Sequence, residues 1–268
     1  MMKAKDVLLW PENVVADTLE LDDPNDNILL DDQLAASIAR SERPPLLRIW
    51  QHSAPDGLVV SRRDVATQAG QWAREQLAVE GCPVFVRSTG GTAVPHGRGM
   101  LNLSLLFPRV AHPGATTDAY YRLLCQPLLD WLNELGGRGE IGDLPGSYCD
   151  GHYNVLLGGR KLVGTAQTWK GGLAGISTHK PGYIVAHACI SVYIEVPRAI
   201  ANINRFYELS HQSFRALPET AVSLHEVWET VHSQEREEVM AVAKRSLLES
   251  CQQFILKMNE AKQSGVQL

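Results

Sequence analysis

Cys149 and Lys161 are the two side chains of this sequence whose types and spacing suggest nucleophilic chemistry. Cys149 lies in the polar loop GSYCDG, between Gly146 and Gly151, where a thiol can be accessible to solvent. A reactive cysteine requires such access, and a nearby cation stabilises its thiolate. On the local sequence alone, a structural cysteine and a solvated lysine remain the simpler interpretation.

The segments HYNVLL and RKLVGT, which follow this loop, predict the two strands of a β-hairpin. Only Gly158 and Gly159 separate them, which is typical of a type I′ or II′ turn. In that hairpin Lys161 faces Leu156, and Cys149 lies seven residues along the same strand, roughly 23 Å away. Contact between the thiol and the amine therefore requires residues 146–152 to fold back toward the lysine.

A glycine-rich turn, RSTGGTAVPHGRG at 87–99, is the second candidate for chemistry. It has neither the P-loop spacing nor the GxGxxG spacing of a dinucleotide site. Backbone amides at Gly90 and Gly91 can approach a carboxylate, carbonyl or phosphate closely, and Arg87 and His96 flank the turn. The alternative is an ordinary glycine-rich loop.

The other thiols and imidazoles give weaker signals. Cysteines in apolar segments behave as small hydrophobic residues, and this describes Cys82, Cys125, Cys189 and Cys251. The sequence has no CxxC or HxxxH spacing, so we expect neither a disulfide framework nor a metal site. The histidines that could act as bases are His96, His152, His179 and His187. His187 lies in an apolar strand, where a hydrogen-bonded core histidine is the simpler interpretation.

Composition limits the class of protein. The 268 residues are 44% hydrophobic and 21% charged, with a net charge of −5, which is typical of a soluble globular protein. No basic run indicates nucleic-acid binding, and no apolar stretch is long enough for a membrane span. Free thiols and the lack of a signal-peptide pattern indicate the cytoplasm. Residues 83–204 carry ten Lys/Arg and seven Asp/Glu, a net of +3 that would attract an acidic partner.

The elements that must position these residues are strands and helices in mixed order, so we expect the α+β class. Leu101, Leu103 and Leu105 alternate with Asn102 and Ser104, which predicts a half-buried strand with a polar face. The predicted strands are 46–50, 57–61, 83–88, 100–107, 152–157, 160–165 and 183–195. The predicted helices are 27–40, 65–81, 116–137 and, from 199 to the end, a helical region that includes one long amphipathic run.

Four segments in this order resemble the lipoate/biotin protein ligase superfamily, which includes lipoate-protein ligases, octanoyltransferases and lipoyl amidotransferases. PLLRIWQHSAPDGLVVSRRD is similar to its early strand pair, and RSTGGTAVPHGRGMLNLSLLF to its Arg-x-x-Gly-Gly turn and following strand. GGRKLVGTAQ is similar to its essential-lysine segment, and IVAHACISV to the strand that carries its His-Gly. The resemblance covers about residues 28–210 and implies mixed or antiparallel sheets packed with helices. We expect one domain, 1–268, in which residues 211–268 form a helical C-terminal extension.

The resemblance also implies an activity and a site. In the cysteine-using branch the nucleophile precedes the Gly-Arg-Lys segment, where this chain has Cys149, and Lys161 would stabilise the thiolate or a developing oxyanion. The implied substrate-binding residues are Arg87, Gly90, Gly91, His96, Asn102, Ser104, Gly164, Ala166 and His187. The face of Leu101, Leu103 and Leu105, or its neighbours, would line an apolar slot for the acyl chain.

We therefore expect an acyltransferase of lipoate metabolism that needs no cofactor. It would move an octanoyl or lipoyl group from an acidic carrier protein to a lysine of a lipoyl-type domain through a cysteine thioester. The alternatives are an ATP-dependent lipoate-protein ligase, which needs ATP and Mg²⁺, and a non-catalytic protein that binds acyl groups. Two departures from the ligase pattern weaken the case for nucleotide binding: Thr92 replaces a glycine, and Gly97 replaces an aspartate. The replacement of a glycine by Ala188 is a mild change.

Overall fold

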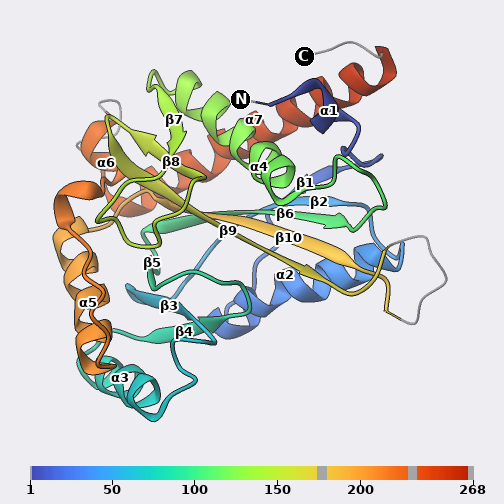
Figure 1. The fold of residues 1–268 in the computed structure, drawn as a ribbon. Coiled ribbons are helices and arrows are strands. Elements are labelled where there is room, and N and C mark those ends of the chain that lie inside the picture. The colour runs from blue at the N-terminus through green and yellow to red at the C-terminus, as the bar shows by residue number, and fades with distance from the viewer. Residues whose placement is uncertain (1, 174–179, 229–233, 265–268) are drawn as a thin grey trace.

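A seven-stranded sheet forms the centre of the computed structural model, which describes residues 2–173, 180–228 and 234–264 (Figure 1). Its order is β1-β2-β6-β10-β9-β8-β7, and every neighbouring pair is antiparallel except β1 and β2. The strands are β1 (Val15–Asp17), β2 (Leu46–Gln51), β6 (Met100–Pro108), β7 (Gly139–Gly142), β8 (Asn154–Leu157), β9 (Arg160–Lys170) and β10 (Tyr183–Ser191).

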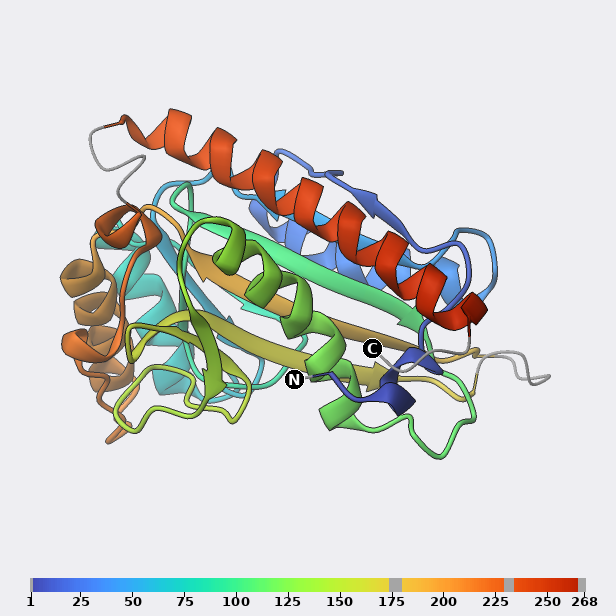
Figure 2. The same cartoon turned by 90° about the horizontal axis from the view of Figure 1, so that it is seen from above.

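Two long helices cover one face of this sheet, as Figure 2 shows from above. They are α4 (Thr117–Glu134) and α7 (Arg236–Ser264), and the short α1 (Ala4–Val7) packs beside them. Thr116 caps α4 because its side chain accepts a hydrogen bond from the N–H of Ala119. The main hydrophobic core lies between these helices and the sheet.

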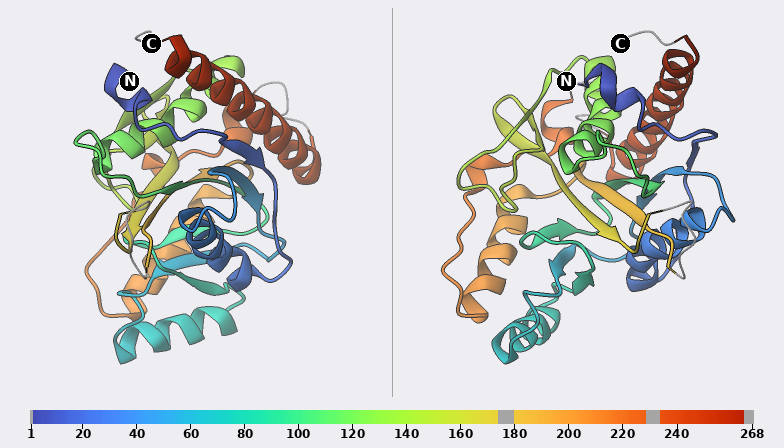
Figure 3. Two further views of the ribbon diagram at one scale, coloured as in Figure 1. Left: turned by 90° about the vertical axis from the view of Figure 1, so that its right-hand side faces the viewer. Right: turned by 45° about the vertical axis from the view of Figure 1, so that its right-hand side comes forward.

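The opposite face of the large sheet meets a second sheet and α2 (Pro24–Ala39), as the two views of Figure 3 show. The second sheet has the order β4-β3-β5, with β3 (Gly57–Ser61) parallel to β4 (Val84–Arg87) and antiparallel to β5 (Val94–His96). Helices α3 (Gln68–Val79) and α5 (Val196–Leu209) pack against each other beside it and complete a second core.

The α+β class and the hairpin agree with the sequence. Gly158 and Gly159 have φ values of 58° and 72°, as a type I′ turn requires, and Leu156 pairs with Lys161 as expected. The prediction of a half-buried strand at 100–107 is wrong, because β6 is central and buried on both faces. Its leucines face the main core, so the expectation that Leu101, Leu103 and Leu105 line a ligand slot is also wrong.

The C-terminal segment is less continuous than its amphipathic pattern suggested. After α5, residues 210–223 contain a 3₁₀ turn, η1 (Pro218–Thr220), and an isolated bridge from Ala221 to Lys161, and α6 (Leu224–Val227) is a single turn. Residues 229–233 lie outside the described part of the chain, and α7 begins at Arg236. Buried side chains of α7, including Leu247 and Phe254, belong to the main core and do not form a separate layer.

Candidate active site

The loop before β8 leaves the line of the hairpin and folds back over Lys161. Gly146 has a φ of +84° and Cys149 a φ of 47°, so both adopt left-handed conformations that redirect the chain. The carboxylate of Asp150 accepts a hydrogen bond from the N–H of Leu144 at 2.8 Å. The N–H of Leu217 donates to the carbonyl of Gly146 at 2.9 Å, which ties the loop to the segment after α5.

Lys161 meets the backbone of this loop. Its buried ammonium donates to the carbonyls of Tyr148 and Cys149, the second at 2.9 Å, and lies 4.3 Å from the centre of the Tyr148 ring. Burial lowers the pKa of Lys161 to about 8, although the nearby Cys149 and Asp150 oppose this shift. The structure therefore brings the two predicted residues together, with the ammonium on the Cys149 carbonyl.

The sulfur of Cys149 lies against the glycine-rich turn. A Cβ atom at Gly91 would stand only 2.6 Å from that sulfur and 3.0 Å from Nη2 of Arg87, so a side chain does not fit there. Gly91 also has a φ of +96°, which favours glycine. This close approach places the sulfur next to a backbone peptide and a guanidinium group.

Arg87 is a buried residue that shapes the turn. Its guanidinium donates to the carbonyls of Gly90 at 3.0 Å, Thr92 at 2.7 Å and Val59 at 2.9 Å. The side chain of Thr92 completes the arrangement, because its hydroxyl accepts a hydrogen bond from the N–H of Cys149 at 2.7 Å. The threonine that replaces a family glycine thus holds the backbone of the predicted nucleophile.

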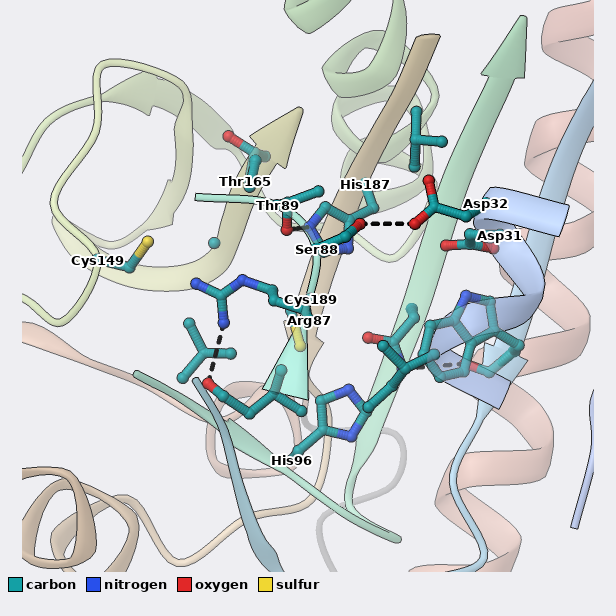
Figure 4. Close-up of a pocket in the computed structure, with 18 residues that line it drawn as sticks. Asp31, Asp32, Arg87, Ser88, Thr89, His96, Cys149, Thr165, His187 and Cys189 are labelled. Atoms are coloured by element: carbon teal, nitrogen blue, oxygen red, sulfur yellow. Dashed lines mark hydrogen bonds between the residues drawn. The ribbon is translucent and has the colours of Figure 1, made fainter. Parts of the chain in front are cut away.

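A pocket opens from Cys149 between the two sheets, with a space of about 620 Å³ that includes its mouth. Figure 4 shows Cys149 and Thr165 at one end, Asp31 and Asp32 at the other, and His187 between them. Eighteen residues line it: Ile28, Asp31, Asp32, Trp50, Val59, Arg87, Ser88, Thr89, Val94, His96, Asn102, Cys149, Gly164, Thr165, Ala166, Val185, His187 and Cys189.

Seven of the eleven predicted site residues line this pocket: Arg87, His96, Asn102, Cys149, Gly164, Ala166 and His187. Lys161, Gly90 and Gly91 are not among its lining residues. Lys161 donates to the Cys149 carbonyl, Gly91 lies against the Cys149 sulfur, and the carbonyl of Gly90 accepts from Arg87. Ser104 lies beneath the wall, and its hydroxyl donates to Asp31 at 2.6 Å.

The two pocket histidines are neutral at physiological pH. Burial lowers the pKa of His187 to about 3, and its Nε2 lies 2.9 Å from the hydroxyl of Thr89. Burial also holds the pKa of His96 well below its usual range. His152 is exposed on the surface, and His179 lies outside the described residues. Neither pocket histidine therefore suits the role of a general base at neutral pH.

Sequence reasoning missed several lining residues, among them Trp50, Thr89 and Cys189. The second pocket thiol, Cys189, is the most informative of these. Burial raises the pKa of Cys189 to about 12, so this thiol stays protonated, whereas Cys149 is only partly buried. No signal in the sequence placed Cys189 in the pocket, because it reads as one residue of an apolar strand.

Two negative findings apply to the described residues only. No group of three or more His, Cys, Asp or Glu side chains there has an arrangement that could hold a metal ion. Within the same ranges, no helix is both long and apolar enough to cross a membrane.

Solved structures with a similar fold include lipoate-protein ligases. A lipoate-protein ligase A crystallised with ATP superposes with a TM-score of 0.62 at 16% identity, over 93% of this chain and 94% of that one. A lipoate protein ligase from Thermoplasma acidophilum with bound lipoic acid gives a TM-score of 0.57 at 17% identity, over 89% and 85%. At these identities the likeness establishes the fold, an α+β catalytic domain of the lipoate-ligase type.

The family follows from sequence comparison. Residues 23–231 match the model of the lipoyl protein ligase A/B catalytic domain, and the chain belongs to that family. An octanoyl-GcvH:protein N-octanoyltransferase of Kyrpidia tusciae is 41% identical over 68% of this chain and 62% of its own length. A protein of the same name from Geobacillus kaustophilus is 30% identical over 71% and 62%. The match thus spans somewhat less than two thirds of these relatives.

Proposed function

We propose that the protein is a cysteine-dependent octanoyltransferase that moves an octanoyl group from a carrier protein to a lysine of a lipoyl-type domain. The observation that carries the proposal is the position of Cys149. Its sulfur lies at the end of a pocket, against Gly91 and near the guanidinium of Arg87, while the Lys161 ammonium holds the backbone carbonyl of Cys149. The relatives named octanoyltransferases support the same acyl group and a GcvH-type donor.

In the first step the Cys149 thiolate attacks the carbonyl carbon of the octanoyl amide on the donor lysine. A C–S bond forms, the C–N bond breaks, and the donor amine leaves with a proton taken from water. Negative charge develops on the carbonyl oxygen during attack. The positive charges of Arg87 and Lys161 and the backbone at Gly91 favour that charge.

In the second step the ε-amine of an acceptor lysine attacks the thioester. A C–N bond forms, the C–S bond breaks, and Cys149 is regenerated as a thiolate while the amine loses a proton. No bond in this sequence is made or broken with ATP, so the proposal requires no nucleotide. The buried pocket holds the chain meanwhile, and six methylenes contribute about 5 kcal/mol at about 0.8 kcal/mol each.

The proposed partners are carrier proteins that present a lysine on a lipoyl-type fold. The central part of the chain, residues 83–204, has a net charge of +3 and includes the turn, the hairpin and Cys149. Opposite charge on the carrier would increase the rate of encounter. We therefore propose that donor and acceptor domains are acidic on the side that carries their lysine.

The test is incubation with octanoyl-GcvH in the presence and absence of ATP, followed by intact and peptide mass spectrometry. We expect an octanoyl adduct on Cys149 without ATP, loss of the adduct in Cys149→Ser, and its persistence in Cys82→Ser. Cys82 is a suitable control because it is buried in the second core, outside the pocket. Acyl transfer that needs ATP and survives Cys149→Ser would instead establish a ligase.

A further inference from the structure

The reach of a lysine side chain limits where an acyl carrier can sit on this protein. Six bonds separate the Cα atom of a lysine from the carbonyl carbon of its acyl group, and at about 1.2 Å per bond they span about 7 Å. Attack by the Cys149 sulfur adds a separation of about 3 Å. The carrier backbone therefore comes within about 10 Å of that sulfur, where it must contact the rim of the reactive loop, residues 146–152.

A strap of chain between α5 and α6, residues 214–222, lies against this loop. The N–H of Leu217 donates to the carbonyl of Gly146 at 2.9 Å, at the start of the reactive loop. The N–H of Val222 donates to the carbonyl of Lys161 at 3.0 Å. The strap is thus hydrogen-bonded both to the loop that carries the proposed nucleophile and to the lysine that holds this loop.

Leu217 presents an exposed apolar side chain from the strap. Its Cδ1 atom lies 2.9 Å from the position that a Cβ would take at Gly146, yet 45% of the leucine surface remains exposed. Gly146 precedes Cys149 by three residues, so their Cα atoms are at most about 11 Å apart. The left-handed conformations of both residues turn the chain and shorten this distance. An exposed apolar group therefore stands where the carrier must make contact.

An aromatic pair lies at the other end of the reactive loop. The rings of Tyr121, from α4, and Tyr153, which directly follows the loop, stack at 4.7 Å with an interplanar angle of 9°. Both residues are only partly buried. Burial raises the pKa of Tyr121, and the nearby Cys149 adds to this rise through its charge. Tyrosine is enriched at protein interfaces, so this pair extends the apolar rim around the loop.

We propose that the strap and the aromatic pair form the docking surface for the carrier domain, with Leu217 as its apolar anchor, an inference that rests on the proposed function. The occupant follows from the chemistry of Cys149, because a lysine on a folded domain reaches the sulfur only when that domain rests on this rim. A carrier with an apolar side chain beside its lysine fits the surface, since burying the exposed part of Leu217 against it favours the complex.

The test compares two octanoyl donors in one preparation, with the rate of the Cys149 adduct as the measurement. Octanoyl-GcvH must dock before it reacts, whereas the octanoyl thioester of N-acetylcysteamine has no carrier surface. Leu217→Ala removes three carbons, each worth roughly fourfold when fully buried, and 45% of the leucine surface is available for burial. We therefore expect kcat/KM for octanoyl-GcvH to fall about sixfold, mainly through KM, relative to the small donor.

Leu256→Ala is the matched control. Leu256 is also an exposed leucine, at 62%, but it lies on α7, which covers the face of the large sheet away from the pocket. It should leave the ratio of the two donors unchanged. Leu217→Met keeps an apolar side chain of similar volume and should retain the ratio within about twofold. Tyr121→Ala should lower the ratio in the same direction as Leu217→Ala.

The outcomes separate the two proposals. An adduct that forms from both donors with an unchanged ratio in Leu217→Ala would refute the docking surface and leave the proposed function standing. Equal slowing of both donors would refute it as well, because the effect would then lie in the reactive loop itself. If the wild type forms no adduct from either donor, the proposed function is wrong and this inference is lost with it.

Discussion

Thr92 provides a sharp test of how the site is built. Its hydroxyl accepts the N–H of Cys149 at 2.7 Å, and Cys149 has a left-handed φ of 47°. A non-glycine residue in that conformation costs roughly 1–2 kcal/mol, so the loop needs contacts that offset the cost. Thr92→Val keeps the shape of the side chain and removes the acceptor.

The magnitude follows from the hydrogen bond. An N–H that loses its partner in a buried position costs about 1–3 kcal/mol, and the partial exposure of Cys149 favours the lower half of that range. A loss of about 1–2 kcal/mol in the competent loop conformation reduces the rate of thioester formation roughly 5- to 30-fold. Thr92→Ser retains the hydroxyl and should stay within about threefold of the wild type.

The assay is the rate of octanoyl adduct formation on Cys149, followed by rapid quenching and mass spectrometry, with a thermal melt of each variant. The backbone carbonyl of Thr92 still accepts from Arg87 in both variants, so the glycine turn is preserved. A wild-type rate in Thr92→Val would show that the loop does not depend on this bond. Equal slowing in Thr92→Ser would assign the effect to something other than the hydroxyl.

Three further predictions concern the same contacts. Gly91→Ala should abolish adduct formation, at least 100-fold by the same mass assay, because a Cβ would collide with the Cys149 sulfur. Arg87→Lys should lower the free energy of unfolding in urea by roughly 2–4 kcal/mol, because one ammonium cannot serve three separate carbonyls. Burial lowers the pKa of Lys161 to about 8, from the 10.5 of an unburied lysine, so the unfolded state binds more protons between these two pH values. The difference in unfolding free energy between the wild type and Lys161→Met should therefore grow with pH. We expect it to rise by up to about 1.4 kcal/mol per pH unit between pH 8 and 10.5. A difference that does not change with pH would contradict the burial of this ammonium.

The local sequence was sufficient to predict the hairpin and the glycine-rich turn. Two glycines between apolar strands predict a two-residue turn of type I′ or II′, and either turn places Leu156 opposite Lys161. The Arg-x-x-Gly-Gly pattern identified the turn at Gly91, because close backbone approach needs a residue without a side chain. The family resemblance, and no local rule, selected Cys149 among five cysteines.

Other features depended on contacts between segments far apart in the chain. Hairpin geometry argued against contact between Cys149 and Lys161, and the return of the loop depends on bonds to Thr92 and Leu217. The alternation in β6 was visible, yet the leucine side faces the helices and Asn102 faces the pocket. A strand buried on both faces carries no local mark of which face meets a ligand, because both faces exclude water.

The sequence by itself therefore indicated the fold class and the two-residue hairpin, and the family resemblance singled out Cys149 and Lys161 as the proposed reactive pair. Only the tertiary structure decided what lies at the far end of the pocket. Its lining includes residues of four neighbouring strands, β9, β10, β6 and β2, and which of these residues meet depends on strand register. Strand register is set by how entire faces of the sheet pack against the core, and that packing involves residues more than a hundred positions apart. No single segment of the sequence therefore shows it.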